Sequence, residues 1–82
     1  MTDSLQGLIE YIVNSLVEDP SQVKVRESQS GSNVRLELRV GKEDMGRVIG
    51  KRGKVANSIR MLLRVAAARQ GKQATLDVID PV

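Results

Sequence analysis

Two glycines near the middle of the chain enclose residue types that bind phosphate. Gly50 and Gly53 lie three positions apart, Lys51 and Arg52 stand between them, and Lys54 follows directly. Glycine permits a tight turn and lets a polyanion approach the main chain without obstruction by a Cβ atom. Lysine and arginine add positive charge and hydrogen-bond donors. The spacing therefore predicts a phosphate-binding loop over residues 50–53.

The charge around this loop has one sign. Residues 1–30 have a net charge of −3 (two bases, five acids) and residues 31–82 one of +6 (eleven bases, five acids). A stretch without any acid holds eight of these bases: Arg47, Lys51, Arg52, Lys54, Arg60, Arg64, Arg69 and Lys72. A solvated helix face is the ordinary alternative, but such faces usually mix both signs. The stretch therefore indicates a partner that is a polyanion.

Other kinds of chemistry find little support in the composition. The chain has no cysteine and no histidine, which removes thiolate and imidazole metal ligands and the commonest general base. A nucleotide P-loop requires Gly-x-x-x-x-Gly-Lys-Ser/Thr, but from Gly46 the spacer is one residue short and Arg52 replaces the hydroxyl residue. The acidic pair Glu43-Asp44 is explained by solvation of a helix N-terminus. We therefore expect no enzyme activity, no cofactor and no metal.

The elements that position the loop follow from the pattern of apolar residues. A first helix is expected from about Ser4 to Glu18, because apolar residues recur there at helical spacing. Residues 23–26 and 34–40 alternate apolar and polar side chains, which predicts two strands around a turn at residues 28–33. A short helix to Ile49, a long helix from the loop to about Gln70, and a strand over residues 74–79 complete the chain. This predicts one domain over residues 1–82, of class α+β, with the order α-β-β-α-α-β.

The same residues match a known signature. Val48-Ile49-Gly50-Lys51-Arg52-Gly53, followed by apolar residues at helical spacing, resembles the Ile-Gly-x-x-Gly motif of KH domains. The element order resembles the type II form, which has a three-stranded mixed sheet packed against three helices. In size the whole chain is similar to the KhpA family of small stand-alone bacterial KH proteins. The resemblance implies a protein that binds single-stranded RNA.

The resemblance also implies which residues meet the RNA. KH domains hold about four nucleotides between the Gly-x-x-Gly loop and a strand edge. The expected contacts are the loop and its flanks: Gly50, Lys51, Arg52, Gly53, Lys54, Arg47, Val48 and Ile49. The expected groove floor is aliphatic: Val55, Ile59, and Leu36 or Leu38, although plain core is the commoner role of each such residue. The chain has a single aromatic residue, Tyr11, so it cannot build the stacking platform of other RNA-binding folds.

The long helix carries more apolar residues than one sheet face can cover. Leu62 and Ala66 can serve the core together with Val55 and Ile59. The remaining apolar side chains predict a dimer interface, with an arginine at its flank: Met61, Val65, Ala68 and Arg64. The family resemblance implies self-association and pairing with a larger jag-type KH protein.

Two functions therefore remain open. One is an RNA-binding post-transcriptional regulator or RNA chaperone acting as a dimer. The other is an assembly module for the larger KH protein in cell division, cell shape or envelope control. No apolar run reaches membrane-spanning length and no signal peptide is evident, so we expect a cytoplasmic protein without a membrane partner.

Overall fold

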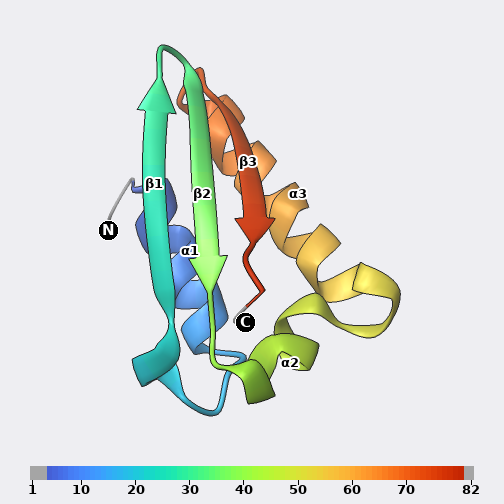
Figure 1. The fold of residues 1–82 in the computed structure, drawn as a ribbon. Helices are drawn as coiled ribbons and strands as arrows, with labels where there is room; N and C mark the ends of the chain where they lie inside the picture. Colours follow the sequence, from blue (N-terminus) through green and yellow to red (C-terminus); the bar gives the residue numbers. More distant parts are fainter. Residues whose placement is uncertain (1–3, 81–82) are drawn as a thin grey trace.

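The computed structural model describes residues 4–80, and its helices and strands follow the order predicted from the sequence (Figure 1). Short 3-10 turns at residues 20–22, 42–44 and 51–53 connect the main elements. The helices and strands are α1 (Leu5–Asn14), β1 (Lys24–Ser30), β2 (Asn33–Arg39), α2 (Met45–Ile49), α3 (Lys54–Arg69) and β3 (Gln73–Val78).

The sheet is mixed, with the strand order β1-β2-β3. β1 and β2 form an antiparallel hairpin, and β2 and β3 run parallel because α2 and α3 form the crossover between them. The turn is shorter than residues 28–33, since Ser30 pairs with Asn33 and only two residues connect the strands. Gly31 has a φ of +60°, as a tight hairpin turn requires. Residues 28–30, which were expected in the turn, instead extend β1 and pair with β2.

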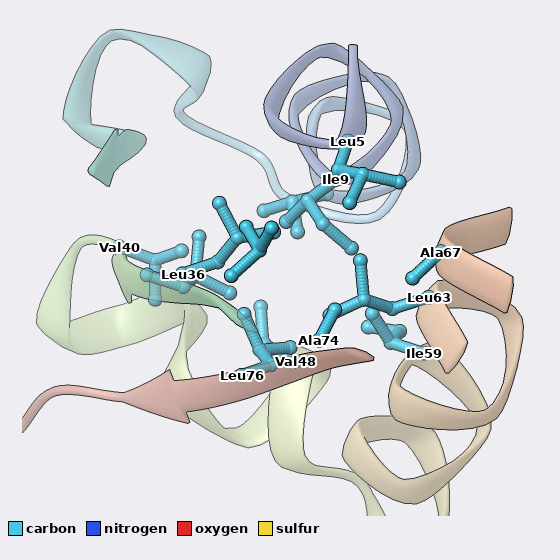
Figure 2. Close-up of a cluster of buried hydrophobic side chains, with 13 residues drawn as sticks. Leu5, Ile9, Leu36, Val40, Val48, Ile59, Leu63, Ala67, Ala74 and Leu76 are labelled. Atoms are coloured by element: carbon cyan, nitrogen blue, oxygen red, sulfur yellow. The ribbon is translucent and has the colours of Figure 1, made fainter. Parts of the chain in front are cut away.

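Helices cover one face of this sheet and form the core with it (Figure 2). The alternation in β2 sends every second side chain to this face, where Val34, Leu36 and Leu38 are buried. The helices contribute the facing side chains: Leu5, Ile9 and Val13 from α1, Val48 from α2, and Ile59, Leu63 and Ala67 from α3. The result is the predicted α+β class, a three-stranded mixed sheet packed against three helices in the order of a type II KH domain.

The first helix is shorter than the sequence suggested. α1 begins after Ser4, whose hydroxyl oxygen accepts a hydrogen bond from the Gly7 amide at 3.0 Å, and it ends at Asn14 rather than Glu18. The chain turns there, so that the Leu16 and Val17 amides both donate to the Val13 carbonyl oxygen. The amides of residues 18 and 19 do not continue the helix and instead donate hydrogen bonds to the Asp44 side chain.

The long helix buries a different stripe from the one predicted. Ala56, Ile59, Leu63 and Ala67 face the core, whereas Leu62 is 53% exposed. The prediction that Leu62 serves the core is therefore wrong, because Leu63 takes that place one residue later. Within residues 4–80, no helix is long and apolar enough to cross a membrane.

Candidate nucleic-acid interface

The loop between α2 and α3 has an unusual backbone conformation. Gly50 (φ +74°), Arg52 (φ +58°) and Gly53 (φ +74°) all lie at positive φ. Positive φ is readily accessible to glycine and costs energy for arginine. Two backbone hydrogen bonds hold the turn: the Gly50 amide donates to Gly46 at 2.9 Å, and the Gly53 amide donates to Gly50 at 3.1 Å. The two glycines are therefore required by the shape of the loop.

Gly50 is also required by close packing. A Cβ atom at this position would overlap the Val55 side chain and would lie 2.8 Å from the Val55 nitrogen. At Gly53 the nearest neighbour of a Cβ atom would be the Asn57 amide nitrogen, 3.8 Å away. The first glycine thus lets α2 and the start of α3 approach each other, while the second mainly permits the backbone angle.

The charges of the loop have no counter-ion among the described residues. Lys51, Arg52 and Lys54 are all exposed, and none forms an ion pair with another residue in the range 4–80. α3 begins directly behind them, with Gly53 as its N-cap and without a side-chain cap or an acidic residue in its first turn. A helix N-terminus carries partial positive charge and unpaired N–H groups. Three cations and a helix end therefore converge on a surface that can accept phosphate.

The edge strand beside the loop is β3, whereas the expected groove floor drew Leu36 or Leu38 from β2. β3 is the outer strand on the side of α3, and α3 packs along it (Figure 1). Arg60 bridges the two: its Nε donates to the Leu76 carbonyl oxygen at 3.1 Å, and its Nη1 donates to Asn57 Oδ1 at 3.1 Å. A small hollow beside this contact is lined by Arg60, Arg64 and Thr75, among others. Sequence reasoning counted Arg60 only as a charge, because its contact with β3 depends on tertiary structure.

The expected aliphatic floor is largely inaccessible. Leu36, Leu38 and Val48 are fully buried, and Ile59 is 3% exposed, so these side chains offer no surface to a ligand in this conformation. Leu36 and Leu38 lie in the central strand and pack in the core, not on the edge strand beside the loop. Of the apolar candidates, Val55 is half-buried and Ile49 is 37% exposed. Of the apolar residues predicted to contact RNA, Val55 and Ile49 are therefore the two with solvent-exposed surface beside the loop.

Arg47 is engaged in ion pairs, in contrast to the loop cations. Its Nη2 lies 2.8 Å from Glu18 Oε1, and its Nη1 lies 3.0 Å from Asp44 Oδ1. Two carboxylates thus balance its charge and connect α2 to the segment after α1. Among the predicted contacts, Arg47 is the one whose charge the fold already neutralises.

Asp44 is a buried carboxylate that sequence reasoning assigned to solvent. Its side chain is 3% exposed, and its two oxygens accept hydrogen bonds from the amides of Glu18 at 3.0 Å and Asp19 at 3.1 Å. The Glu18 amide is the main reason that the pKa of Asp44 lies below its ordinary value of 3.8; burial opposes this, and Asp19 and Arg47 support it. Asp44 therefore anchors the start of α2, and with it the loop, to the turn after α1.

Replacement of Asp44 by asparagine should lower the melting temperature at neutral pH. Asparagine has one acceptor oxygen for three donors, so N–H groups that are partly shielded from solvent lose their partner. Because the folded-state pKa is depressed, the carboxylate stabilises the wild type above pH 3.8, and this contribution is lost as the pH falls through the folded pKa. Thermal unfolding followed by circular dichroism at pH 7 and pH 3 should show the difference between the proteins shrinking in acid. The exposed neighbour provides a control, Glu43→Gln; equal melting temperatures for Asp44→Asn and wild type at pH 7 would contradict the anchor.

Comparison with known proteins agrees with this geometry. A model of the KhpA/KhpB KH domain matches residues 6–78. The chain belongs to this family. Its relatives include the RNA-binding protein KhpA of Halalkalibacterium halodurans, 40% identical over 76 residues that cover 93% of this chain and all of the relative. The KhpA proteins of Clostridium acetobutylicum (40% over 75 residues; 92% of this chain and all of the relative) and Borreliella burgdorferi (41% over 73 residues; 89% of each chain) are similarly close.

Solved structures share the fold at low sequence identity. Era in complex with a nucleotide and a segment of 16S ribosomal RNA aligns with a TM-score of 0.65 at 15% identity, over 94% of this chain and 31% of that one. Aquifex aeolicus Era bound to GDP and aluminium fluoride gives 0.64 at the same identity and coverage. The fold of this chain is thus also present as part of a longer protein.

Proposed function

We propose that this chain binds single-stranded RNA by gripping the sugar-phosphate backbone with the loop of residues 50–53. The observation that carries the proposal is a group of three exposed cations at the N-terminus of α3, Lys51, Arg52 and Lys54, which form no ion pair within residues 4–80. The names of the KhpA relatives, which are RNA-binding proteins, support RNA as the polyanion. The protein acts as a binding protein in the cytoplasm rather than as an enzyme, and serves as a post-transcriptional regulator or RNA chaperone.

Within this proposal the groove runs from the loop along α3 and the outer edge of β3. Arg60 occupies this edge through its bond to the Leu76 carbonyl oxygen, so its guanidinium can meet a base or phosphate that enters. Ile49 and Val55 supply the apolar surface beside the loop. Contacts with the sugar-phosphate backbone dominate the affinity and carry no information on base identity.

The salt dependence of RNA binding tests this proposal. A domain that covers about four nucleotides should neutralise about two to four phosphates, and each contact in single strands contributes a slope of about −0.7. The logarithm of the association constant for a short RNA should therefore fall against the logarithm of salt concentration with a slope of roughly −1.5 to −3. Fluorescence anisotropy titrations at several salt concentrations measure the slope. An affinity that does not change with salt would exclude the loop cations as the binding surface.

A second role, in assembly, is favoured by the apolar side of α3. Met61 is 65%, Leu62 53% and Val65 51% exposed, and Ala68 is exposed beside them in the helix. Such a row of apolar side chains on one helix indicates an interface. We propose that it joins two copies of the chain in a twofold dimer, or one copy to a larger jag-type KH protein in cell division or envelope control. Arg64 lies exposed beside the β3 edge and so flanks this row.

A charge on this row should abolish self-association. Val65→Asp places a carboxylate in the proposed interface, where its desolvation opposes assembly. We expect the wild type to sediment as a dimer at tens of micromolar in analytical ultracentrifugation and the variant as a monomer. Tyr11→Asp is the matched control, because Tyr11 is an exposed apolar residue on α1. A wild type that is already monomeric would contradict the dimer.

A further inference from the structure

The side of the sheet that faces away from α1 and α3, here called the open face, carries polar side chains. Its residues alternate along each strand with those on the face toward the helices, which are buried mainly in β2 and β3. They are Lys24, Arg26, Ser28 and Ser30 of β1, Asn33, Arg35, Glu37 and Arg39 of β2, and Gln73, Thr75 and Asp77 of β3. None of the helices in residues 4–80 covers this face (Figure 1).

Two cations oppose each other at one end of the open face. Lys24 and Arg39 are direct partners in the antiparallel register, and both side chains are exposed. Like charges in such a position are destabilising, since neighbouring side chains on one face lie close together. Neither residue forms an ion pair within residues 4–80. Within the described residues, this unfavourable pair of like charges thus has no compensating acid.

The charge beside this pair is also only partly balanced. Arg26 lies two residues along β1 and stands opposite Glu37. The Glu37 carboxylate lies 3.8 Å from Arg35 and forms its ion pair with that arginine instead. No ion pair of Arg26 occurs in the described part of the chain. Lys24, Arg26 and Arg39 together form the open-face patch.

Arg35 lies on the same face, and its charge is compensated by ion pairs. Its Nη2 lies 2.7 Å from Asp77 Oδ2, and its Nε donates to the same oxygen at 2.8 Å. Both carboxylates of the open face, Glu37 and Asp77, thus lie within ion-pair distance of this one arginine. Positive charge therefore accumulates at the other end of the face, where β1 begins and β2 ends.

We propose that the open-face patch is a second contact for the phosphates of a bound RNA strand. An acidic protein is the other conceivable partner, but protein interfaces have an apolar centre, and none of these open-face strand residues is apolar. Interfaces with nucleic acid are polar and strongly positive, as this face is. The patch also lies at the end of the sheet from which β2 leads into α2 and the loop (Figure 1). RNA held at the loop can therefore extend to the patch, which lengthens the site beyond about four nucleotides.

RNAs of two different lengths can distinguish binding at the open-face patch from binding at the loop. The inference rests on RNA being the ligand proposed above, so the probes are a uridine tetramer, which fills the groove alone, and a uridine dodecamer, which can reach further. The test variant is Lys24→Gln with Arg39→Gln, and the charge-matched control is Arg69→Gln with Lys72→Gln. The control residues lie at the far end of α3 and in the turn after it, and form no ion pair within residues 4–80. Removal of the opposed charges should leave the melting temperature unchanged or raise it.

The patch predicts a loss for the long RNA only. Affinity of the test variant for the dodecamer should fall by about three- to tenfold, and its salt slope should become shallower by about 1.4, as expected for two lost phosphate contacts. Affinity for the tetramer should stay at the wild-type value, and the control should lose clearly less dodecamer affinity than the test variant. Equal losses for both lengths, equal losses in the control, or no loss at all would overturn the proposal. Charge reversal at Lys51 and Arg52 should weaken binding of both RNAs, so a failure confined to that variant would count against the loop and not against the patch.

Discussion

Reversal of both charges at the tip of the loop should abolish RNA binding. In the variant Lys51→Asp with Arg52→Asp, two attractive contacts with phosphate become repulsive. A charged hydrogen bond contributes about 1.5–3 kcal/mol, so we expect the dissociation constant to rise by at least about a hundredfold. Fluorescence anisotropy with a short single-stranded RNA at low salt measures the change.

The structure predicts that this variant remains folded. Both side chains are exposed, and neither has an ion-pair partner among residues 4–80. Arg52 has a φ of +58°, a region in which aspartate is tolerated better than most residues. Circular dichroism should therefore give a melting temperature close to that of the wild type. The charge-matched control is Arg69→Asp with Lys72→Asp, which should bind RNA far better than the loop variant. Unchanged affinity in a folded loop variant would refute the assignment of the loop.

The substitution Gly50→Ala should have the largest effect on stability of the single changes considered. A Cβ atom at this position would overlap Val55, and alanine is strained at a φ of +74°. Strain at positive φ costs about 1–3 kcal/mol and overpacking a similar amount, so we expect a loss of roughly 2–4 kcal/mol in unfolding free energy. Urea denaturation measures this loss, and RNA binding should weaken because the loop must shift.

Gly46→Ala is the matched control for this change. Gly46 lies in α2, its φ is not positive, and no atom lies within 4 Å of an added Cβ atom. Alanine in a helix is favoured over glycine by about 0.5–1 kcal/mol, so this variant should be as stable as the wild type or more stable. If Gly50→Ala were as stable as Gly46→Ala, the close approach of α2 and α3 at the loop would be wrong.

The anchoring of α2 explains how a short helix can hold the loop in place. α2 has five residues and is too short to be stable alone. Asp44 ties its beginning to the turn after α1, Arg47 pairs with Glu18, and Val48 is buried in the core. These contacts with the segment after α1 and with the core thus fix the helix that presents Gly50. The loop can then meet RNA without ordering the helices around it, which reduces the entropic cost of binding.

The sequence was sufficient to predict the fold and the loop because both follow from local patterns. Alternation in residues 34–40 identifies a strand with one buried face, and the Gly-x-x-Gly spacing identifies a turn between two helices. The choice between Leu62 and Leu63 could not be made in this way. Apolar residues occupy three successive positions, 61–63, and helical periodicity alone does not decide which of them faces the core.

The rest of the site depends on contacts between distant parts of the chain. β3 pairs with β2 across about forty residues, so the sequence does not reveal that β3 forms the edge beside α3. The burial of Asp44 follows from two amides 25 and 26 residues away, whereas an acid at a helix start usually faces solvent. Leu36 and Leu38 were expected near the ligand, but they lie on the central strand under the helices.

Chemical-shift mapping of the labelled protein with a short single-stranded RNA tests the central claim most directly. The account predicts that the largest amide shifts occur at residues 50–54, with smaller shifts along the β3 edge near Leu76 and at Arg60. The exposed apolar row around Val65 should change little in this titration. Largest shifts on that row or on α1, with residues 50–54 unperturbed, would contradict the grip of the loop on RNA.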